Sequence, residues 1–186
     1  MSFLPIEHPD PPRAEVLLQI LSSVLEPRSC VYAAGPLDSG KTYYERMASG
    51  DERPVRAENE IRLTGFVADL RKRLRYPVFD PGPLRIVGWS GGEYGAFFLE
   101  VIRRYVRECW FMNGWEYSIG STKEFVLCCT MQIACFAESG ERLTISEGMR
   151  LIREASDFVR GLDLDDAKLR SRLEALSRIE GGSREW

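Results

Sequence analysis

The chain has 186 residues, 44% of them hydrophobic, which is enough apolar material for the core of one ordinary globular domain. Its 28 acidic and 25 basic residues give a net charge of −3, which argues against a nucleic-acid polymer or a membrane surface as its partner. The one histidine, His8, leaves Ser-His, Cys-His and histidine-rich metal chemistry without the residues that they need. A carboxylate is therefore the expected catalytic group, and we expect no metal or other cofactor.

The five cysteines point to a compartment rather than to catalysis. All lie in apolar stretches, none forms a CxxC pair, and neither a signal peptide nor a run of about 20 apolar residues is present. These features predict thiols that serve as small core residues in a reducing environment. We therefore expect a cytoplasmic protein.

Hydrophobic periodicity predicts an alternation of helices and strands along the chain. A Pro-rich lead-in precedes a predicted amphipathic helix over residues 14–25. Short apolar runs predict strands over residues 29–34, 76–80, 109–112 and 132–137. Helical spacing predicts further helices over residues 58–74, 93–108, 122–131, 146–160 and 163–179, with a short one over 42–47.

The predicted strands are short and continuously apolar, which is typical of a parallel sheet covered on both faces. The sequence therefore predicts an α/β fold of flavodoxin-like or Rossmann-like type, with a parallel sheet of about four or five strands flanked by helices. We expect a single domain over residues 1–186. Its core spans about residues 28–160, with a helical N-terminal extension over 14–25 and a C-terminal helix over 163–180.

Three loops of this fold are expected to share one pocket. In open parallel sheets, ligands bind beyond the carboxyl ends of the strands. The loops after Ala34, Asp80 and Met112 all leave predicted strands at that edge. We therefore expect them to line one site.

Residues 35–42, GPLDSGKT, match the phosphate-binding motif G-x-x-x-x-G-K-[ST] and follow an apolar strand. Pro36, however, removes a backbone donor from the loop that would hold the phosphate. The residues after Thr42 are polar, and Asp80 is followed by Pro-Gly-Pro rather than standing free to bind magnesium. A P-loop phosphotransferase stays open as an alternative, and Lys41 could also contact a single phosphate or ribose.

A second pattern combines two segments far apart in the chain. Residues 32–36 read YAAGP after an apolar run, and Ser118 and Glu124 stand six residues apart with Gly120 between them. In this order and spacing the chain resembles the nucleoside 2-deoxyribosyltransferase family and its nucleotide N-glycosidase relatives. Residues 114–120, GWEYSIG, look like the GWxxSxGA-xxE variant of the family. The resemblance covers about residues 28–160.

The resemblance implies hydrolysis or transfer at the N-glycosidic bond of a (deoxy)nucleoside or a nucleoside 5′-monophosphate. Glu124 would be the catalytic carboxylate that meets the anomeric carbon, and Glu100 the second catalytic acid, with Glu93 as the other candidate for that role. Trp89 could stack on the base. The expected substrate-binding residues are Tyr32, Gly35, Pro36, Lys41, Glu93, Asn113, Ser118, Gly120 and Ser121.

Other interpretations of the same residues stay open. If Glu124 lies in a first helical turn, its role could be purely structural: it could complement the helix dipole or form a capping box with Ser121. A non-catalytic nucleotide-binding or sensor module of the same fold is the alternative function. Because family members commonly complete their sites across a dimer interface, we expect a homodimer or a higher homo-oligomer. The expected partner is a small nucleoside or nucleotide.

Overall fold

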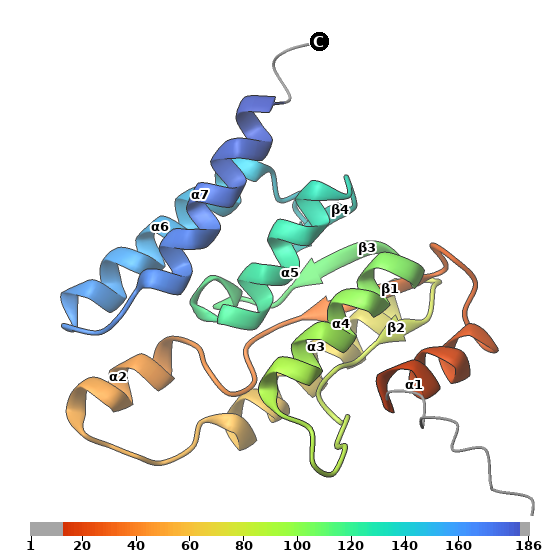
Figure 1. Cartoon of the computed structure of the whole chain (residues 1–186), viewed down its shortest axis with the longest axis horizontal. Coiled ribbons are helices and arrows are strands. Elements are labelled where there is room, and N and C mark those ends of the chain that lie inside the picture. Colours follow the sequence, from red (N-terminus) through yellow and green to blue (C-terminus); the bar gives the residue numbers. More distant parts are fainter. Residues whose placement is uncertain (1–12, 183–186) are drawn as a thin grey trace, which may run out of the picture.

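The computed structural model describes residues 13–182, so the Pro-rich lead-in with His8 and the last residues, 183–186, lie outside the described part. Its sheet consists of β1 (Cys30–Ala34), β2 (Val78–Phe79), β3 (Val106–Phe111) and β4 (Ala134–Ala137). All neighbouring strands pair in parallel, in the spatial order β2-β1-β3-β4. Helices flank this sheet (Figure 1), which confirms the predicted α/β Rossmann-like fold.

The helices occur close to the predicted ranges. They are α1 (Arg13–Ser22), α2 (Lys41–Ser49), α3 (Arg56–Arg73), α4 (Gly91–Tyr105), α5 (Ile119–Thr130), α6 (Ile145–Gly161) and α7 (Ala167–Gly182), with a 3-10 turn, η1 (Trp115–Tyr117), before α5. Figure 1 shows α6 and α7 side by side, next to α5. None of the helices within residues 13–182 combines the length and the apolar character needed to cross a bilayer.

Strand β1 lies at the centre of the core. Its five residues are buried, and their side chains alternate between the two faces of the sheet. Tyr32 and Ala34 pack in the cluster that contains α4, α5 and α6 residues, whereas Val31 and Ala33 pack against residues of α3 such as Leu63. Because both faces are covered, the strand reads as a continuous apolar run, as the sequence indicated.

The junction between α4 and β3 differs from the prediction. The helix ends at Tyr105 rather than at residue 108, and Val106 is already extended, with φ −83° and ψ 129°. Glu108 then pairs in register with Val31 of β1 and Ala134 of β4. Arg107 and Glu108 are polar residues that suit a helix, but pairing with two neighbouring strands outweighs this local preference.

The strand order creates a topological switch point. The chain passes from β1 to β2 on one side and then to β3 on the other side of β1. Crevices for ligands form at the carboxyl edge beside such a reversal. The carboxyl ends of β1 and β3 lie side by side there, since Ala34 pairs with Phe111 and accepts a hydrogen bond from the Met112 N–H at 2.9 Å.

Gly148 allows α6 to approach α5 closely. A Cβ atom at this position would lie 2.1 Å from Cε1 of Phe125, which is fully buried and next to Glu124 in the chain. We predict that Gly148→Ala lowers the free energy of unfolding by about 1–3 kcal/mol, because the ring or the helix must move. Urea unfolding measures this change.

The matched control is Gly65→Ala, in the middle of α3, where a Cβ atom would meet open space. This variant should gain about 0.5–1 kcal/mol from helix propensity. If both variants gained stability equally, the close contact between α6 and Phe125 would be refuted.

Candidate functional site

A pocket of about 220 Å³ opens at the switch point. Gly35, Leu37, Asp38 and Ser39 line it from the loop after β1, Pro81 and Leu84 from the loop after β2, and Ser118, Gly120 and Ser121 from the start of α5. The prediction that three loops share one site is therefore confirmed. The backbone at Gly35 is closely approached, since a Cβ atom there would lie 3.0 Å from Cε of Met112 and that side chain would have to shift.

Tyr32 and Glu124 meet at this pocket. The Tyr32 hydroxyl donates a hydrogen bond of 2.7 Å to Oε1 of Glu124, which joins β1 to α5. Tyr32 is fully buried and its ring stacks on Phe79 at a centroid distance of 5.7 Å. The other carboxylate oxygen of Glu124, Oε2, makes no hydrogen bond to any residue in the described range. It is therefore the oxygen available to a ligand.

Glu124 does not serve as a helix-capping residue. Ser118 caps α5, its Oγ accepting a hydrogen bond of 3.3 Å from the Ser121 N–H. Because α5 begins at Ile119, Glu124 lies in the second helical turn, and the first turn has no acidic residue. The dipole and capping-box interpretations of Glu124 are thus wrong. The helix thus begins at Ile119 rather than at residue 122, with Ser118 as its N-cap.

Burial controls the protonation of this pair. Only 8% of Glu124 is exposed, and burial raises the pKa of its carboxyl from an ordinary 4.5 to about 7, although the hydrogen bond from Tyr32 acts in the opposite direction. Burial, together with the charge of Glu124, raises the pKa of Tyr32 well above its usual range. Glu124 therefore titrates near neutral pH. A carboxyl perturbed in this way beside a pocket is typical of functional sites.

The start of α5 offers donors without partners. The Ser121 hydroxyl is buried and makes no hydrogen bond within the described residues, although Ser121 lines the pocket. The N–H groups of Ile119 and Gly120 belong to the first helical turn, where no intrahelical acceptor exists. Lys123 is exposed and also lines the pocket. This end of the pocket suits a hydroxyl or an anionic oxygen.

The pocket lining also includes aromatic rings and a charged pair that the sequence did not predict. Tyr94 and Phe98 of α4 contribute the rings, with centroids 6.1 Å apart. Asp38 and Arg56 contribute the charges. Asp38 stands inside the GPLDSGKT segment, but nothing in the sequence showed that Arg56 would fold back onto it.

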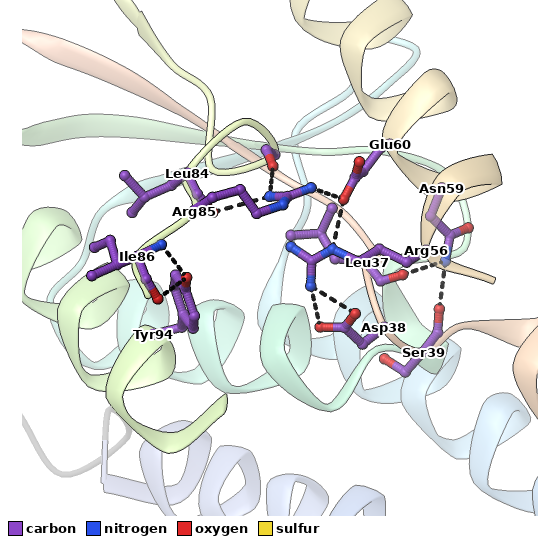
Figure 2. A network of polar contacts seen from close by, with 11 residues as sticks. Leu37, Asp38, Ser39, Arg56, Asn59, Glu60, Leu84, Arg85, Ile86 and Tyr94 are labelled. Carbon is purple, nitrogen blue, oxygen red and sulfur yellow. Dashed lines mark hydrogen bonds and ion pairs between the residues drawn. The ribbon is translucent and has the colours of Figure 1, made fainter. Parts of the chain in front are cut away.

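Figure 2 shows how this charged pair is held. Nη1 of Arg56 donates to both carboxylate oxygens of Asp38 at 2.7 Å, and Nε donates to Glu60 at 2.6 Å. Glu60 also pairs with Arg85 from the loop after β2. On the far side of this loop, the Tyr94 hydroxyl accepts from the Ile86 N–H at 2.6 Å and donates to the Ile86 carbonyl at 3.2 Å. The network thus ties both pocket loops to α3 and α4.

The GPLDSGKT loop has the wrong shape for a phosphate. Nδ2 of Asn59 donates to the carbonyl oxygens of Leu37 and Ser39 at 2.9 Å each, so the loop turns carbonyl groups toward a side chain (Figure 2). A phosphate-binding loop needs inward N–H groups instead. Lys41 lies 3.9 Å from Glu45 and 5.0 Å from the centre of the Phe158 ring. These contacts argue against a P-loop phosphotransferase.

Three predicted binding residues lie outside the pocket. Pro36, Lys41 and Asn113 line a separate hollow of about 410 Å³. The Asn113 N–H donates to Glu138 at 2.8 Å. Gly35 and Leu37, on either side of Pro36, line the pocket, whereas the immediate neighbours of Lys41 and Asn113 do not.

Both candidates for the second catalytic acid, Glu93 and Glu100, also lie outside the pocket. Glu93 forms a capping box with Ser90 at the start of α4, and its exposed carboxylate is used there. Glu100 pairs with Arg103 and Arg104 on the surface of the same helix. Neither glutamate lines the pocket. Spacing along a helix could not reveal these local partners.

Trp89, expected to stack on a base, packs instead on the rings of Tyr94 and Phe97 at 5.1 and 5.5 Å. The cysteines are free thiols, as expected, and burial raises the pKa of Cys109, on β3, to about 12. A thiol in that state is a poor nucleophile at neutral pH.

No protein-family model, curated protein or solved structure matches this chain. Within residues 13–182, no group of three or more His, Cys, Asp or Glu side chains is arranged to hold a metal ion. The chemical interpretation of the pocket therefore depends on its own residues and on the motif resemblance.

The raised pKa of Glu124 predicts a pH-dependent effect on stability. Its folded-state pKa of about 7 exceeds the ordinary 4.5, so its contribution to stability is fully present below pH 4.5 and is lost as the pH rises through 7. We predict that Glu124→Gln, which keeps an acceptor for Tyr32, exceeds the wild type by up to about 3 kcal/mol above pH 7. Urea unfolding of both proteins across this pH range measures the difference, and a constant difference would contradict the raised pKa.

Proposed function

We propose that this pocket binds a nucleoside or a nucleoside 5′-monophosphate and that Glu124 cleaves its N-glycosidic bond. The observation that carries the proposal is the buried Glu124 carboxylate, which is hydrogen-bonded by Tyr32 and borders a pocket at the switch point of the sheet. Glycosidic cleavage needs a carboxylate beside the anomeric carbon, and Oε2 of Glu124 is the oxygen left over for that role.

The chemistry divides into two steps. Oε2 of ionised Glu124 bonds to the anomeric carbon as the C–N bond breaks, and the base leaves with the bonding electrons and takes up a proton from solvent. Water then hydrolyses the glycosyl ester, or a second base accepts the sugar in a transfer reaction. Tyr32 holds the carboxylate in place through Oε1 throughout. The ionised form is needed, so activity should rise as the pH passes through about 7.

Two kinds of group in the pocket lining support a substrate made of a sugar and a base. The free donors at the start of α5, including the Ser121 hydroxyl, suit the sugar hydroxyls or a 5′-phosphate. The rings of Tyr94 and Phe98 suit a flat base. Glu124 lines the same pocket as these donors and rings. Cleavage of the bond between sugar and base requires a carboxylate in the same pocket as the groups that bind the sugar and the base.

The first test is incubation with a panel of nucleosides and their 5′-monophosphates, followed by chromatography for free base. We expect release from at least one member and a loss of at least about a thousandfold in kcat/KM for Glu124→Gln. Glu154→Gln, which changes an exposed surface glutamate of α6, is the matched control and should keep the activity. Binding of an intact nucleotide without release would instead favour the sensor alternative.

The second test concerns Tyr32. Tyr32→Phe keeps the buried ring but removes the hydrogen bond that holds down the pKa of Glu124. We predict that the pH of half-maximal activity shifts upward and that kcat/KM at neutral pH falls by roughly tenfold. A pH–rate profile of both proteins measures the shift. A loss of activity without any shift would show that Tyr32 does not act through the ionisation of Glu124.

A further inference from the structure

The Asp38–Arg56 pair is the polar feature of the pocket that the proposed reaction does not use. Both residues line the pocket, as do Tyr94 and Phe98. The Asp38 side chain is 71% exposed and that of Arg56 is 33% exposed, so a ligand can reach both. The pair is also held in place, because Arg56 is bonded to Glu60 behind it (Figure 2).

The net charge of the network around this pair indicates which part of a nucleotide it would bind. Arg56 lies between the carboxylates of Asp38 and Glu60, and Glu60 is shared with Arg85. Two acids and two bases leave the network with no net charge, so it gives a phosphate little attraction. The start of α5, with its unpaired donors and Lys123, is the better place for an anion. The Asp38–Arg56 pair is therefore suited to a neutral polar group such as the edge of a base.

The unused hydrogen-bonding capacity of the pair defines that edge. A carboxylate has about four lone-pair sites, and Asp38 accepts from Arg56 once through each oxygen, which leaves each oxygen able to accept again. Nη2 of Arg56 makes no hydrogen bond to any described residue, because the bonds of this side chain go through Nε and Nη1. The pair thus offers two acceptors beside one donor.

We propose that Asp38 and Arg56 determine base specificity and select guanine. Guanine presents two adjacent N–H donors, at N1 and N2, beside the O6 acceptor. Asp38 accepts from the two N–H groups and Nη2 of Arg56 donates to O6. Hypoxanthine lacks the N2 amino group, and adenine has its amino group where guanine has O6, so both leave part of the pair unmatched. This inference rests on the proposed function, because it takes a nucleoside or nucleotide as the ligand.

The test measures binding of guanosine and inosine 5′-monophosphates to the Glu124→Gln protein by calorimetry, and kcat/KM for both with Glu124 present. We expect a preference for guanine of about tenfold, since a site built to accept an N–H group rejects the analogue that lacks it. Asp38→Asn should reduce the preference to nearly one. Asp69→Asn, which makes the same change at an exposed aspartate of α3 that pairs with Lys72, should keep it.

The outcomes separate this inference from the proposed function. Preferential binding of the guanine nucleotide without release of base would support the Asp38–Arg56 assignment and refute the cleavage reaction. Release of bases without a preference for guanine would refute the assignment and leave the reaction intact. The assignment is also overturned if Asp38→Asn keeps the preference, if Asp69→Asn loses it to the same degree, or if neither nucleotide binds.

Discussion

The hydrogen bond between Tyr32 and Glu124 depends on the whole arrangement of the sheet. The two residues are 92 positions apart in the chain, and they meet because β1 and β3 are parallel neighbours and α5 follows β3 after the short η1 turn. Tyr32 must face the α4 and α5 side of the sheet, which the alternation of β1 provides. A shift of one residue in the register of β1 would turn Tyr32 to the α3 side and leave Glu124 buried without its donor.

Burying Glu124 without a cation costs stability. Asp38 in the pocket lining and Glu60 behind it are both paired with Arg56. Among residues 13–182, Glu124 has only the Tyr32 hydroxyl as a partner and no cation, so its carboxyl remains protonated to unusually high pH. The rings around it, including Phe125 and Phe98, supply apolar burial that offsets this penalty. A loss of folding stability at one residue that the surrounding core offsets is typical of functional sites.

Two parts of the pocket lining are built by different means. At the start of α5, donors remain because the first turn of any helix lacks intrahelical acceptors, and Ser118 satisfies only one of them. In the loops, Arg56 and Asn59 of α3 hold the segment after β1, and Arg85 ties the segment after β2 to the same helix. A helix on one face of the sheet thus positions loops that serve a pocket bordered by helices of the other face (Figures 1 and 2).

Local sequence patterns determined the fold class and the alternation of elements, because a parallel strand covered on both faces needs a continuous apolar run. They also determined that three loops converge, because the loops that bind ligands in such a sheet all leave its carboxyl edge. They also singled out Tyr32, Gly35, Ser118 and Glu124, which the structure brings together. Tertiary structure alone decided the rest. Pro36, Lys41 and Asn113 face another hollow, Glu93 and Glu100 serve local partners, and Asp38 and Arg56 enter the pocket. Those outcomes depend on side-chain directions and on contacts between distant residues, for which neither periodicity nor spacing along the chain carries a signal.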